Sequence, residues 1–211
     1  GLAELRDEFF PTLFSLVEPD EIRWVFISHD DPDHTGNLNE LMRLAPNATV
    51  VVNWFMRERM SQTLEVSPLR QRWVADGEIL DAGDRKLLAI RPPVYDSPTT
   101  RGLFDPTTGV YWSSDAFAAP MLTPVNDVAD LDPQFWTESL TMFSQALSPW
   151  IHIADDARFQ ATVDRIEALG ASTIAGCHTP VVRRSHVDGA LGATRVAPTA
   201  PAAPLPDQAV L

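Results

Sequence analysis

The sequence lacks the features that tie a protein to a disulfide-forming compartment, a membrane or nucleic acid. Cys177 is the only cysteine among 211 residues, so no disulfide can form within the chain and a cytoplasmic location is expected. No apolar run reaches the ~20 residues that span a bilayer, so we expect no membrane partner. The net charge is −13 and no run of Lys and Arg occurs. This argues against a nucleic-acid partner, because phosphate binding requires a basic surface.

A cluster of ionisable residues follows one hydrophobic strand. The β-branched and aromatic run at residues 22–27 predicts a buried strand, and residues 28–36 then read Ser-His-Asp-Asp-Pro-Asp-His-Thr-Gly. Burying so many ionisable groups without a counter-charge would cost several kcal/mol for each group. A divalent metal is the simplest counter-charge, since imidazole and carboxylate are common metal ligands. The alternative is a helix-capping loop, but a cap accounts for one Asp or Thr and not for the whole run.

The spacing within this loop indicates room for two metals. In extended backbone alternate side chains point to the same side, so His29, Asp31 and Asp33 are expected to face one way. His34 follows as the chain turns. One metal could take the first pair of ligands, and a neighbouring metal the second pair.

Three further candidate ligands each lie just past the carboxyl end of an apolar run. They are Asp96, Asp115 and His178. Because ligands in layered α/β proteins gather at strand ends, these separate runs can converge on one point. Taken singly, each has an ordinary alternative: a turn residue for Asp96, a cap for Asp115, and a buried core histidine for His178. Together with the four candidate ligands of the first loop they make three imidazoles and four carboxylates, more than one metal can use.

Strand-like and helix-like segments alternate along the chain, as is typical of layered α/β proteins. An N-terminal helix over residues 2–17 is expected to pack through apolar residues at helical spacing, namely Leu5, Phe9, Leu13 and Leu16. Further helices are expected over 37–44, 54–64, 133–147 and 156–169, strands over 49–52, 109–114 and 172–175, and short strands with tight turns within 72–92. One metal-binding domain is expected over residues 1–190, followed by a disordered Pro- and Ala-rich tail over residues 191–211.

The combination of these motifs resembles the metallo-β-lactamase fold superfamily. Within it the chain is most similar to the flavodiiron and stand-alone oxygen-binding di-iron branch. That branch has His-x-Glu-x-Asp-His, a later His-Ser/Trp-Pro, a Ser-x-Asp-Ala-Phe stretch and a final His-Gly-Pro. The resemblance covers roughly residues 1–185 and is specific because several motifs combine. The matching segments are His29–His34, Asp96–Pro98, Ser114–Phe117 and His178–Pro180.

The resemblance implies a four-layer αββα sandwich that holds two iron ions, with manganese or zinc as alternative metals. It further implies that O2 or another small oxidant such as NO is bound or reduced. Seven residues would supply the ligands. One metal would be bound by His29, Asp31 and Asp96, the other by Asp33, His34 and His178, and Asp115 would bridge the two.

The chain departs from the branch at two of these ligand positions. Asp31 stands where the branch has Glu, and Asp96 stands where nearly all members have His. Four carboxylates make a harder donor set, which should lower the reduction potential of iron and make manganese more competitive. Two other functions therefore stay open: a dinuclear hydrolase that uses a bridging hydroxide, and a degenerate, non-enzymatic metal-binding sensor.

Partners follow from the same resemblance. Flavodiiron proteins carry a flavodoxin-like domain after the core, but only 33 residues follow His178, so no flavin is expected in this chain. Electrons would then come from a separate donor protein, and a homodimer is a further expectation. The superfamily core begins with several strands, whereas only 28 residues precede His29, so the chain is expected to lack the first strands.

Overall fold

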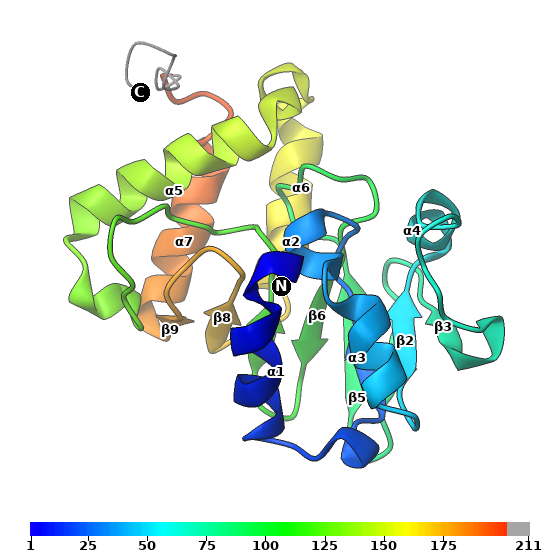
Figure 1. Cartoon of the computed structure of the whole chain (residues 1–211). Helices are drawn as coiled ribbons and strands as arrows, with labels where there is room; N and C mark the ends of the chain where they lie inside the picture. Colours follow the sequence, from blue (N-terminus) through cyan, green and yellow to red (C-terminus); the bar gives the residue numbers. More distant parts are fainter. Residues whose placement is uncertain (202–211) are drawn as a thin grey trace, which may run out of the picture. The chain divides into compact units, whose positions relative to one another are not determined.

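The computed structural model describes residues 1–201 (Figure 1). The chain divides into two compact units. Unit 1 comprises Gly1–Ile90 and Ser97–Arg101, and unit 2 comprises Arg91–Asp96 and the chain from Gly102 onward. The chain leaves unit 2 directly after Asp96. Asp96 and Ser97 therefore belong to different units although they are neighbours in the sequence.

Unit 1 is built on a three-stranded parallel sheet. Its strands lie in the order β1 (Trp24–Phe26), β2 (Thr49–Val52) and β3 (Gln71–Trp73). The three valines of β2 are at most 1% exposed, which explains why this central strand reads as a continuous apolar run. Because the strands are parallel, the loops that follow β1 and β2 leave from the same edge of the sheet.

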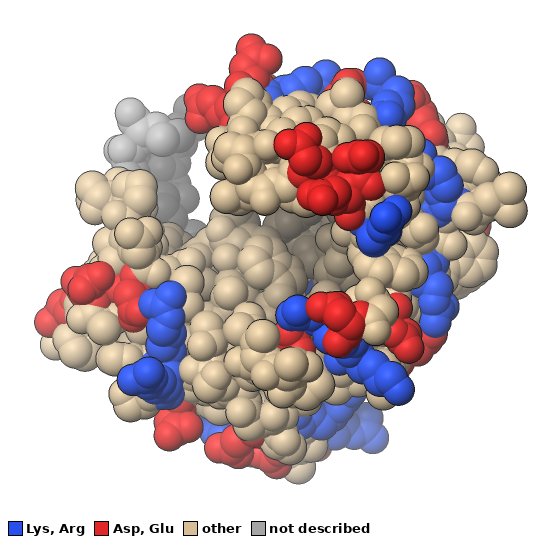
Figure 2. Space-filling view, turned by 90° about the horizontal axis from the view of Figure 1, so that it is seen from below, with Lys and Arg blue, Asp and Glu red and all other residues tan. Residues whose placement is uncertain are grey.

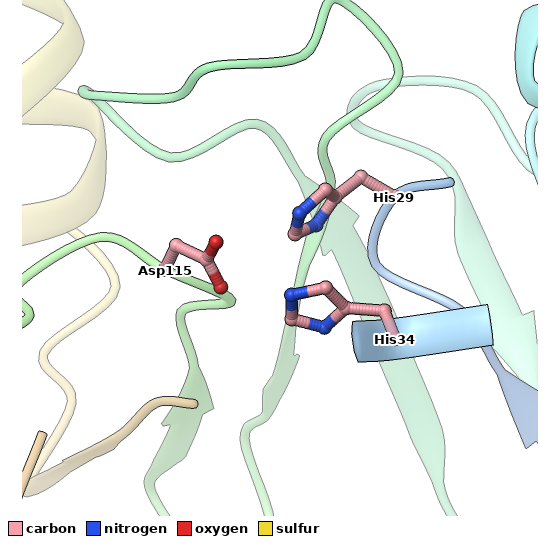
Figure 3. A group of neighbouring side chains, drawn as sticks. All are labelled: His29, His34 and Asp115. Atoms are coloured by element: carbon pink, nitrogen blue, oxygen red, sulfur yellow. The ribbon is translucent and has the colours of Figure 1, made fainter. Parts of the chain in front are cut away.

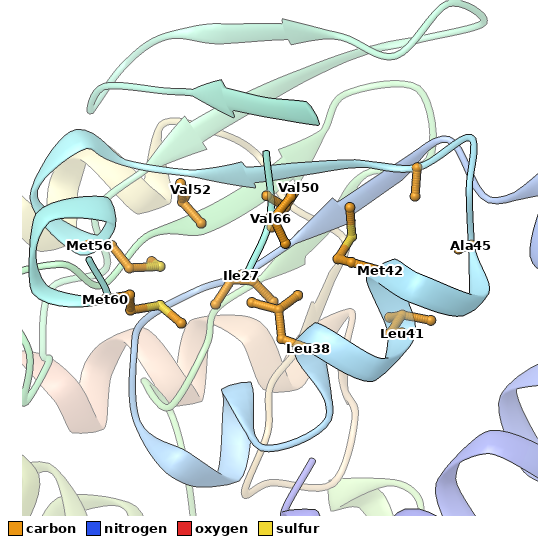
Figure 4. Packing of buried hydrophobic residues seen from close by; sticks show 11 residues of the cluster. Ile27, Leu38, Leu41, Met42, Ala45, Val50, Val52, Met56, Met60 and Val66 are labelled. Carbon is orange, nitrogen blue, oxygen red and sulfur yellow. The ribbon is translucent and has the colours of Figure 1, made fainter. Parts of the chain in front are cut away.

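Short helices connect these strands and supply much of the core of unit 1. They are α2 (Pro32–Thr35), α3 (Leu38–Leu44) and α4 (Trp54–Arg59). Figure 4 shows side chains of α3 and α4 packed with those of β2 in one cluster. The cluster comprises Ile27, Leu38, Leu41, Met42, Ala45, Ala48, Val50, Val52, Met56, Met60 and Val66. Burying a large apolar side chain contributes about 1.5–3 kcal/mol, so this cluster holds the end of β1 firmly in place.

The N-terminal helix is shorter than predicted and packs through a different face. A 3-10 turn, η1 (Ala3–Leu5), precedes α1 (Arg6–Phe14), and Leu13 contacts the core cluster as predicted. The prediction was wrong for Leu5 and Leu16, which are 49% and 81% exposed. Leu5 lies in the tighter 3-10 turn and Leu16 lies beyond the end of α1, so neither keeps the 3.6-residue spacing on which the prediction depended.

Two further parts of unit 1 can be compared with the predicted elements. β4 (Ile79–Asp81) pairs antiparallel with β5 (Lys86–Ile90), and Gly83 at φ +102° makes the tight turn that the sequence predicted. The helix predicted over residues 54–64 ends at Arg59. Ser61 and Thr63 follow soon after, and their hydroxyl groups compete with the helix for backbone hydrogen bonds.

In unit 2, four strands pair side by side. They are β6 (Gly102–Asp105), β7 (Val110–Trp112), β8 (Thr173–Ala175) and β9 (Val182–Arg183). The pairings β6–β7 and β8–β9 are antiparallel, whereas β7–β8 is parallel. The parallel pair decides the position of the site, because its two carboxyl ends lie at the same edge. Asp115 follows β7 and His178 follows β8.

Three longer helices belong to unit 2. They are α5 (Pro133–Leu147), α6 (Asp156–Glu167) and α7 (Ser185–Val196). The first two lie where the apolar periodicity predicted them. Short 3-10 helices elsewhere in the chain are η2 (Pro19–Glu21), η3 (Pro68–Arg70), η4 (Val128–Asp130) and η5 (Pro149–Ile153).

Helix α7 corrects the predicted start of the tail at residue 191. Its buried residues are Val187, Ala190, Leu191, Ala193 and Thr194. Three of these five are small or polar, so the apolar pattern was weak. The side-chain amide of Gln145 in α5 donates a 3.0 Å hydrogen bond to the carbonyl of Ala197 just past the helix. The remainder of the predicted tail, residues 202–211, lies outside the described residues.

The surface carries charges of both signs. Figure 2 shows acidic and basic side chains in small separate groups on the face it presents, with uncharged residues between them. No helix within residues 1–201 is long and apolar enough to cross a membrane.

Candidate metal centre

His29 is held at the end of β1 by the sheet and by its neighbour Ser28. The β1–β2 pairing continues to Ile27, whose N–H donates a 3.0 Å hydrogen bond to the carbonyl of Val51. Ser28 and His29 are both buried, and the Ser28 hydroxyl lies 3.2 Å from His29 Nδ1. A hydrogen bond at Nδ1 leaves Nε2 available as a metal ligand, an arrangement common in metal-binding histidines.

The next candidate ligands are placed by the one-turn helix α2. It begins at Pro32, whose backbone angle suits the first helical position, and the carbonyl of Asp31 accepts a 3.0 Å hydrogen bond from the N–H of His34. The prediction that His29, Asp31 and Asp33 share one extended stretch was therefore wrong for Asp33. Its side chain is positioned by a helical turn instead.

Within unit 1 each imidazole has a carboxylate beside it. His29 Nε2 lies 3.8 Å from an oxygen of Asp31, and His34 Nε2 lies 3.2 Å from an oxygen of Asp33. The two rings lie side by side, with centroids 3.9 Å apart, His29 on the loop after β1 and His34 on α2 (Figure 3). Unit 1 thus brings together the four ligands predicted from the first loop.

Asp115 lies in a strained loop directly after β7. Its neighbours Ser114 and Phe117 have φ of 59° and 64°, in the left-handed region that non-glycine residues rarely occupy. Such strain costs of order 1–3 kcal/mol per residue and is often found at functional sites. The Ser113 hydroxyl donates a 2.9 Å hydrogen bond to the carbonyl of Ala116, which closes the loop around Asp115. Asp115 itself is only 5% exposed.

His178 reaches the same edge of unit 2 from β8. Its Nε2 lies 3.7 Å from Asp115 Oδ1. The two loops approach closely because Gly176 has no Cβ: an added Cβ would lie 2.9 Å from the carbonyl oxygen of Ser114. The Cys177 N–H donates a 2.9 Å hydrogen bond to that same oxygen. Sequence reasoning did not single out Gly176, although a glycine two residues before a candidate ligand was a usable signal.

Asp96 belongs to unit 2 and is exposed, but the backbone just before it is well anchored. The Tyr95 N–H donates to Ser148 Oγ at 2.7 Å, and the Tyr95 carbonyl accepts hydrogen bonds from Ser148 Oγ at 2.9 Å and from Trp150 Nε1 at 3.0 Å. The rings of Tyr95 and Trp150 also stack, with centroids 4.8 Å apart. These anchors lie more than 50 residues along the chain, and sequence reasoning missed them.

The three imidazole–carboxylate pairs fit a shared metal in each case. Two ligands bonded to one metal at about 2.0–2.2 Å can lie no further apart than about 4.4 Å. The observed separations of 3.8, 3.2 and 3.7 Å all fall below this limit. Each pair combines a nitrogen with an oxygen donor, which suits iron, manganese and zinc.

Asp30 lies between two candidate ligands, and sequence reasoning assigned it no role. Its side chain is 8% exposed and forms an ion pair with Arg59 of α4. Burial alone would raise the pKa of Asp30, but hydrogen bonds from Arg59 and Thr99, together with the charge of Arg59, hold it below its ordinary value. The carboxylate therefore stays ionised at neutral pH.

An open pocket of about 530 Å³ adjoins His178 in unit 2. Most of its walls are apolar. The lining residues are Ala119, Pro120, Met121, Pro124, Val125, Phe143, Cys177, His178 and Thr179. Its volume and mostly apolar lining are those of an ordinary small-molecule pocket.

The fold of the chain is similar to the folds of solved protein structures. Rubredoxin oxygen:oxidoreductase from Desulfovibrio gigas has a TM-score of 0.79 at 16% sequence identity, and the match covers 92% of this chain and 48% of that chain. The chemotaxis sensor ODP, solved as a peroxy di-iron species, has a TM-score of 0.75 at 18% identity, covering 94% of this chain and 79% of that chain. These likenesses confirm the predicted metallo-β-lactamase-like α/β fold.

The sequence comparisons agree with the structural ones. Diflavin flavoprotein A 1 of Synechocystis sp. is 26% identical over 190 residues, which are 86% of this chain and 31% of the relative. The chain thus spans about a third of the length of that curated relative. The family model described as "ODP family beta lactamase" matches residues 4–178. This match covers most of the chain and confirms the predicted resemblance, so the chain belongs to the ODP family of beta-lactamase-fold proteins.

Proposed function

We propose that this chain is the core of a non-haem di-iron protein that binds or reduces O2 or NO. The observation that carries the proposal is the pairing of an imidazole nitrogen with a carboxylate oxygen at 3.2–3.8 Å in three places. Family membership supports iron and oxygen, because the similar structures include an oxygen:oxidoreductase and a sensor described with a di-iron species.

Seven residues supply the ligands in this proposal. Metal site 1 consists of His29, Asp31 and Asp96, metal site 2 consists of Asp33, His34 and His178, and Asp115 bridges them. The pairs measured within each unit support this division, since His29 lies beside Asp31 and His34 lies beside Asp33. The four carboxylates would balance the four positive charges of two divalent ions.

The chemistry divides between the metals and the chain. When bound, two ferrous ions would supply electrons for reducing the substrate. The chain's own residues set the conditions: Ser28 fixes the ring of His29, and the strained loop after β7 holds Asp115 in a buried position. The apolar pocket beside His178 would admit an uncharged diatomic molecule.

The proposal also names the metal and the protein partners. Iron is proposed, with manganese and zinc as alternatives, because an oxygen-rich donor set also suits harder ions. Electrons would come from a separate donor protein, and a homodimer in the cytoplasm is the expected assembly.

A second candidate is an oxygen sensor that binds without turnover. The family match favours it, since the family model is described as ODP and the similar structure of that name is a chemotaxis sensor. Reversible binding of O2 without consumption of reductant would identify this function.

Metal analysis of anaerobically purified protein tests the proposal. We expect close to two metal ions per chain with iron predominating, and a change in the optical spectrum when O2 or NO is added. Consumption of O2 in the presence of a chemical reductant would separate reduction from binding.

A matched pair of histidine variants provides the control. His34→Ala should lose metal, whereas His152→Ala, an exposed histidine outside the proposed ligand set, should bind as the wild type does. Wild-type protein that binds neither iron nor manganese would overturn the proposal. Ester or amide hydrolysis that depends on zinc, without any response to O2, would favour the hydrolase instead.

A further inference from the structure

Asp30 is bound on both carboxylate oxygens, although it lies between His29 and Asp31. Oδ2 accepts a hydrogen bond from Arg59 Nε at 2.5 Å. Oδ1 accepts one from Thr99 Oγ1 at 2.7 Å and a longer one from Ser97 Oγ at 3.3 Å. A carboxylate that is 8% exposed and accepts hydrogen bonds from three donors is held in one position by the fold, unlike a chance contact at the surface.

The three donors come from two other segments of unit 1. Arg59 ends α4, the helix that begins directly after β2. Ser97 and Thr99 lie in the segment 97–101, and their hydroxyls are 2.8 Å apart in a hydrogen bond of their own. Asp30 therefore links the loop after β1 to both α4 and the segment 97–101.

The segment 97–101 is itself rigidly held. Thr99 is fully buried, and its carbonyl accepts a 2.5 Å hydrogen bond from the side-chain amide of Asn53, the cap of α4. At the other end, the Arg101 N–H donates a 2.9 Å hydrogen bond to the carbonyl of Ser28. The donors to Asp30 thus sit on a segment whose backbone cannot easily move.

We propose that Asp30 is the positioning residue of metal site 1. It fixes the backbone that carries His29 and Asp31, and through Ser97 it fixes the peptide directly after Asp96. The positions of the three ligands of metal site 1 therefore all depend on the carboxylate of Asp30. This inference rests on the proposed function, because it assumes the dinuclear centre described there.

The chemistry of metal site 1 explains why such an anchor is needed. Two of its three proposed ligands are aspartates, whose short side chains can correct little for an error in the backbone. Ligand distances tolerate only about 0.2 Å. Metal site 2 depends on Asp30 less directly, only through the carbonyl of Asp31 that accepts the N–H of His34, since the helical turn of α2 places Asp33 and His34, and the loop after β8 places His178.

Variants at Thr99 test this role with little risk to folding. Thr99→Val keeps the shape of the side chain but removes the hydroxyl that donates to Asp30, whereas Thr99→Ser restores it. Asp30→Ala removes all three hydrogen bonds. Asp127→Ala is the matched control, because Asp127 also pairs with an arginine, Arg183, and caps η4 through the N–H of Ala129, but lies in unit 2.

The measurement is a titration of metal-free protein with Co²⁺ under anaerobic conditions, in which optical bands report each site separately. Wild type is expected to fill two sites. Asp30→Ala and Thr99→Val should weaken metal site 1 by roughly 10- to 100-fold, the usual effect of losing an outer partner of a ligand, and should weaken metal site 2 by much less. Thr99→Ser should bind as wild type does, and Asp127→Ala should keep both sites although it unfolds more easily.

The outcomes distinguish the two proposals. If wild type fills two sites and the Asp30 and Thr99 variants fill both with unchanged affinity, the positioning role is wrong and the proposed function stands. Equal weakening of both sites in Asp30→Ala, Thr99→Val and Asp127→Ala would show a general effect of stability and would also overturn it. Wild type that binds no Co²⁺ or Fe²⁺ would overturn both.

Discussion

Replacing Gly176 with alanine should push apart the two loops of unit 2 that carry Asp115 and His178. The added Cβ would lie 2.9 Å from the carbonyl oxygen of Ser114, with two more atoms at 3.0 Å. Ordinary contacts of a Cβ begin at 3.4 Å. The neighbouring backbones must therefore separate by about 0.5 Å, the kind of local shift that overpacking forces.

This shift acts on both ligands at once. Ser114 directly precedes Asp115, and Gly176 lies two residues before His178. Overpacking of this kind typically costs about 1–3 kcal/mol, so we expect the free energy of unfolding of the metal-free protein to fall by that amount. Because ligand distances tolerate only about 0.2 Å, the affinity of metal site 2 should also fall, by roughly 10- to 100-fold.

Urea unfolding of metal-free protein and anaerobic Fe²⁺ titration measure the two effects. Gly192→Ala is the matched control, since Gly192 is exposed in α7 and a Cβ there would meet no atom within 4 Å. It should raise stability by up to about 1 kcal/mol through helix propensity. The reasoning fails if Gly176→Ala unfolds at the wild-type urea concentration and still binds metal at both sites with wild-type affinity.

Three further predictions concern stability alone. Glu78 has a pKa held below its ordinary value of 4.5 by the N–H of Ala75 and by Arg72. Because the pKa of Glu78 is lower in the folded than in the unfolded chain, the ionised carboxylate stabilises the fold at pH values above 4.5, and this contribution is lost as the pH falls through the folded-state pKa. The urea midpoints of wild type and Glu78→Gln should therefore differ at pH 7 and converge below pH 4.5. Asp132→Ala removes the cap that accepts the Phe135 N–H at 2.9 Å and should lower the free energy of unfolding by about 0.5–2 kcal/mol. An unchanged thermal unfolding temperature would contradict this. Leu140→Ala empties a fully buried position in α5 and should cost about 2–5 kcal/mol by urea unfolding; a loss under 1 kcal/mol would mean that the surroundings collapse into the space.

The local elements and the first group of ligands could be predicted from the sequence alone. Strand β2 and helices α3, α5 and α6 lie where apolar periodicity indicated them. His29, Asp31, Asp33 and His34 come together because they lie within six residues of each other at the end of a buried strand. Near neighbours in sequence stay near in space whatever the tertiary packing, so this part needs no long-range information.

Local rules failed where a small change in backbone geometry altered the face of an element. Asp33 was expected in extended backbone, but Pro32 starts α2 one residue earlier. Leu5 and Leu16 were expected to pack, but a 3-10 turn and an early helix end moved them into solvent. Helix α7 was missed because small and polar residues occupy three of its five buried positions.

Only the tertiary structure decided how Asp115 and His178 meet and which groups hold Asp96 and Asp30. The first pair depends on β7 and β8 pairing in parallel, some 60 residues apart in sequence, and on the absence of a Cβ at Gly176. Asp30 was visible as one of a run of acidic residues, but its partner Arg59 lies 29 residues away. Such contacts join groups that lie far apart in the sequence. They form only when the strands and helices pack, because only the packed fold brings these groups within hydrogen-bonding distance.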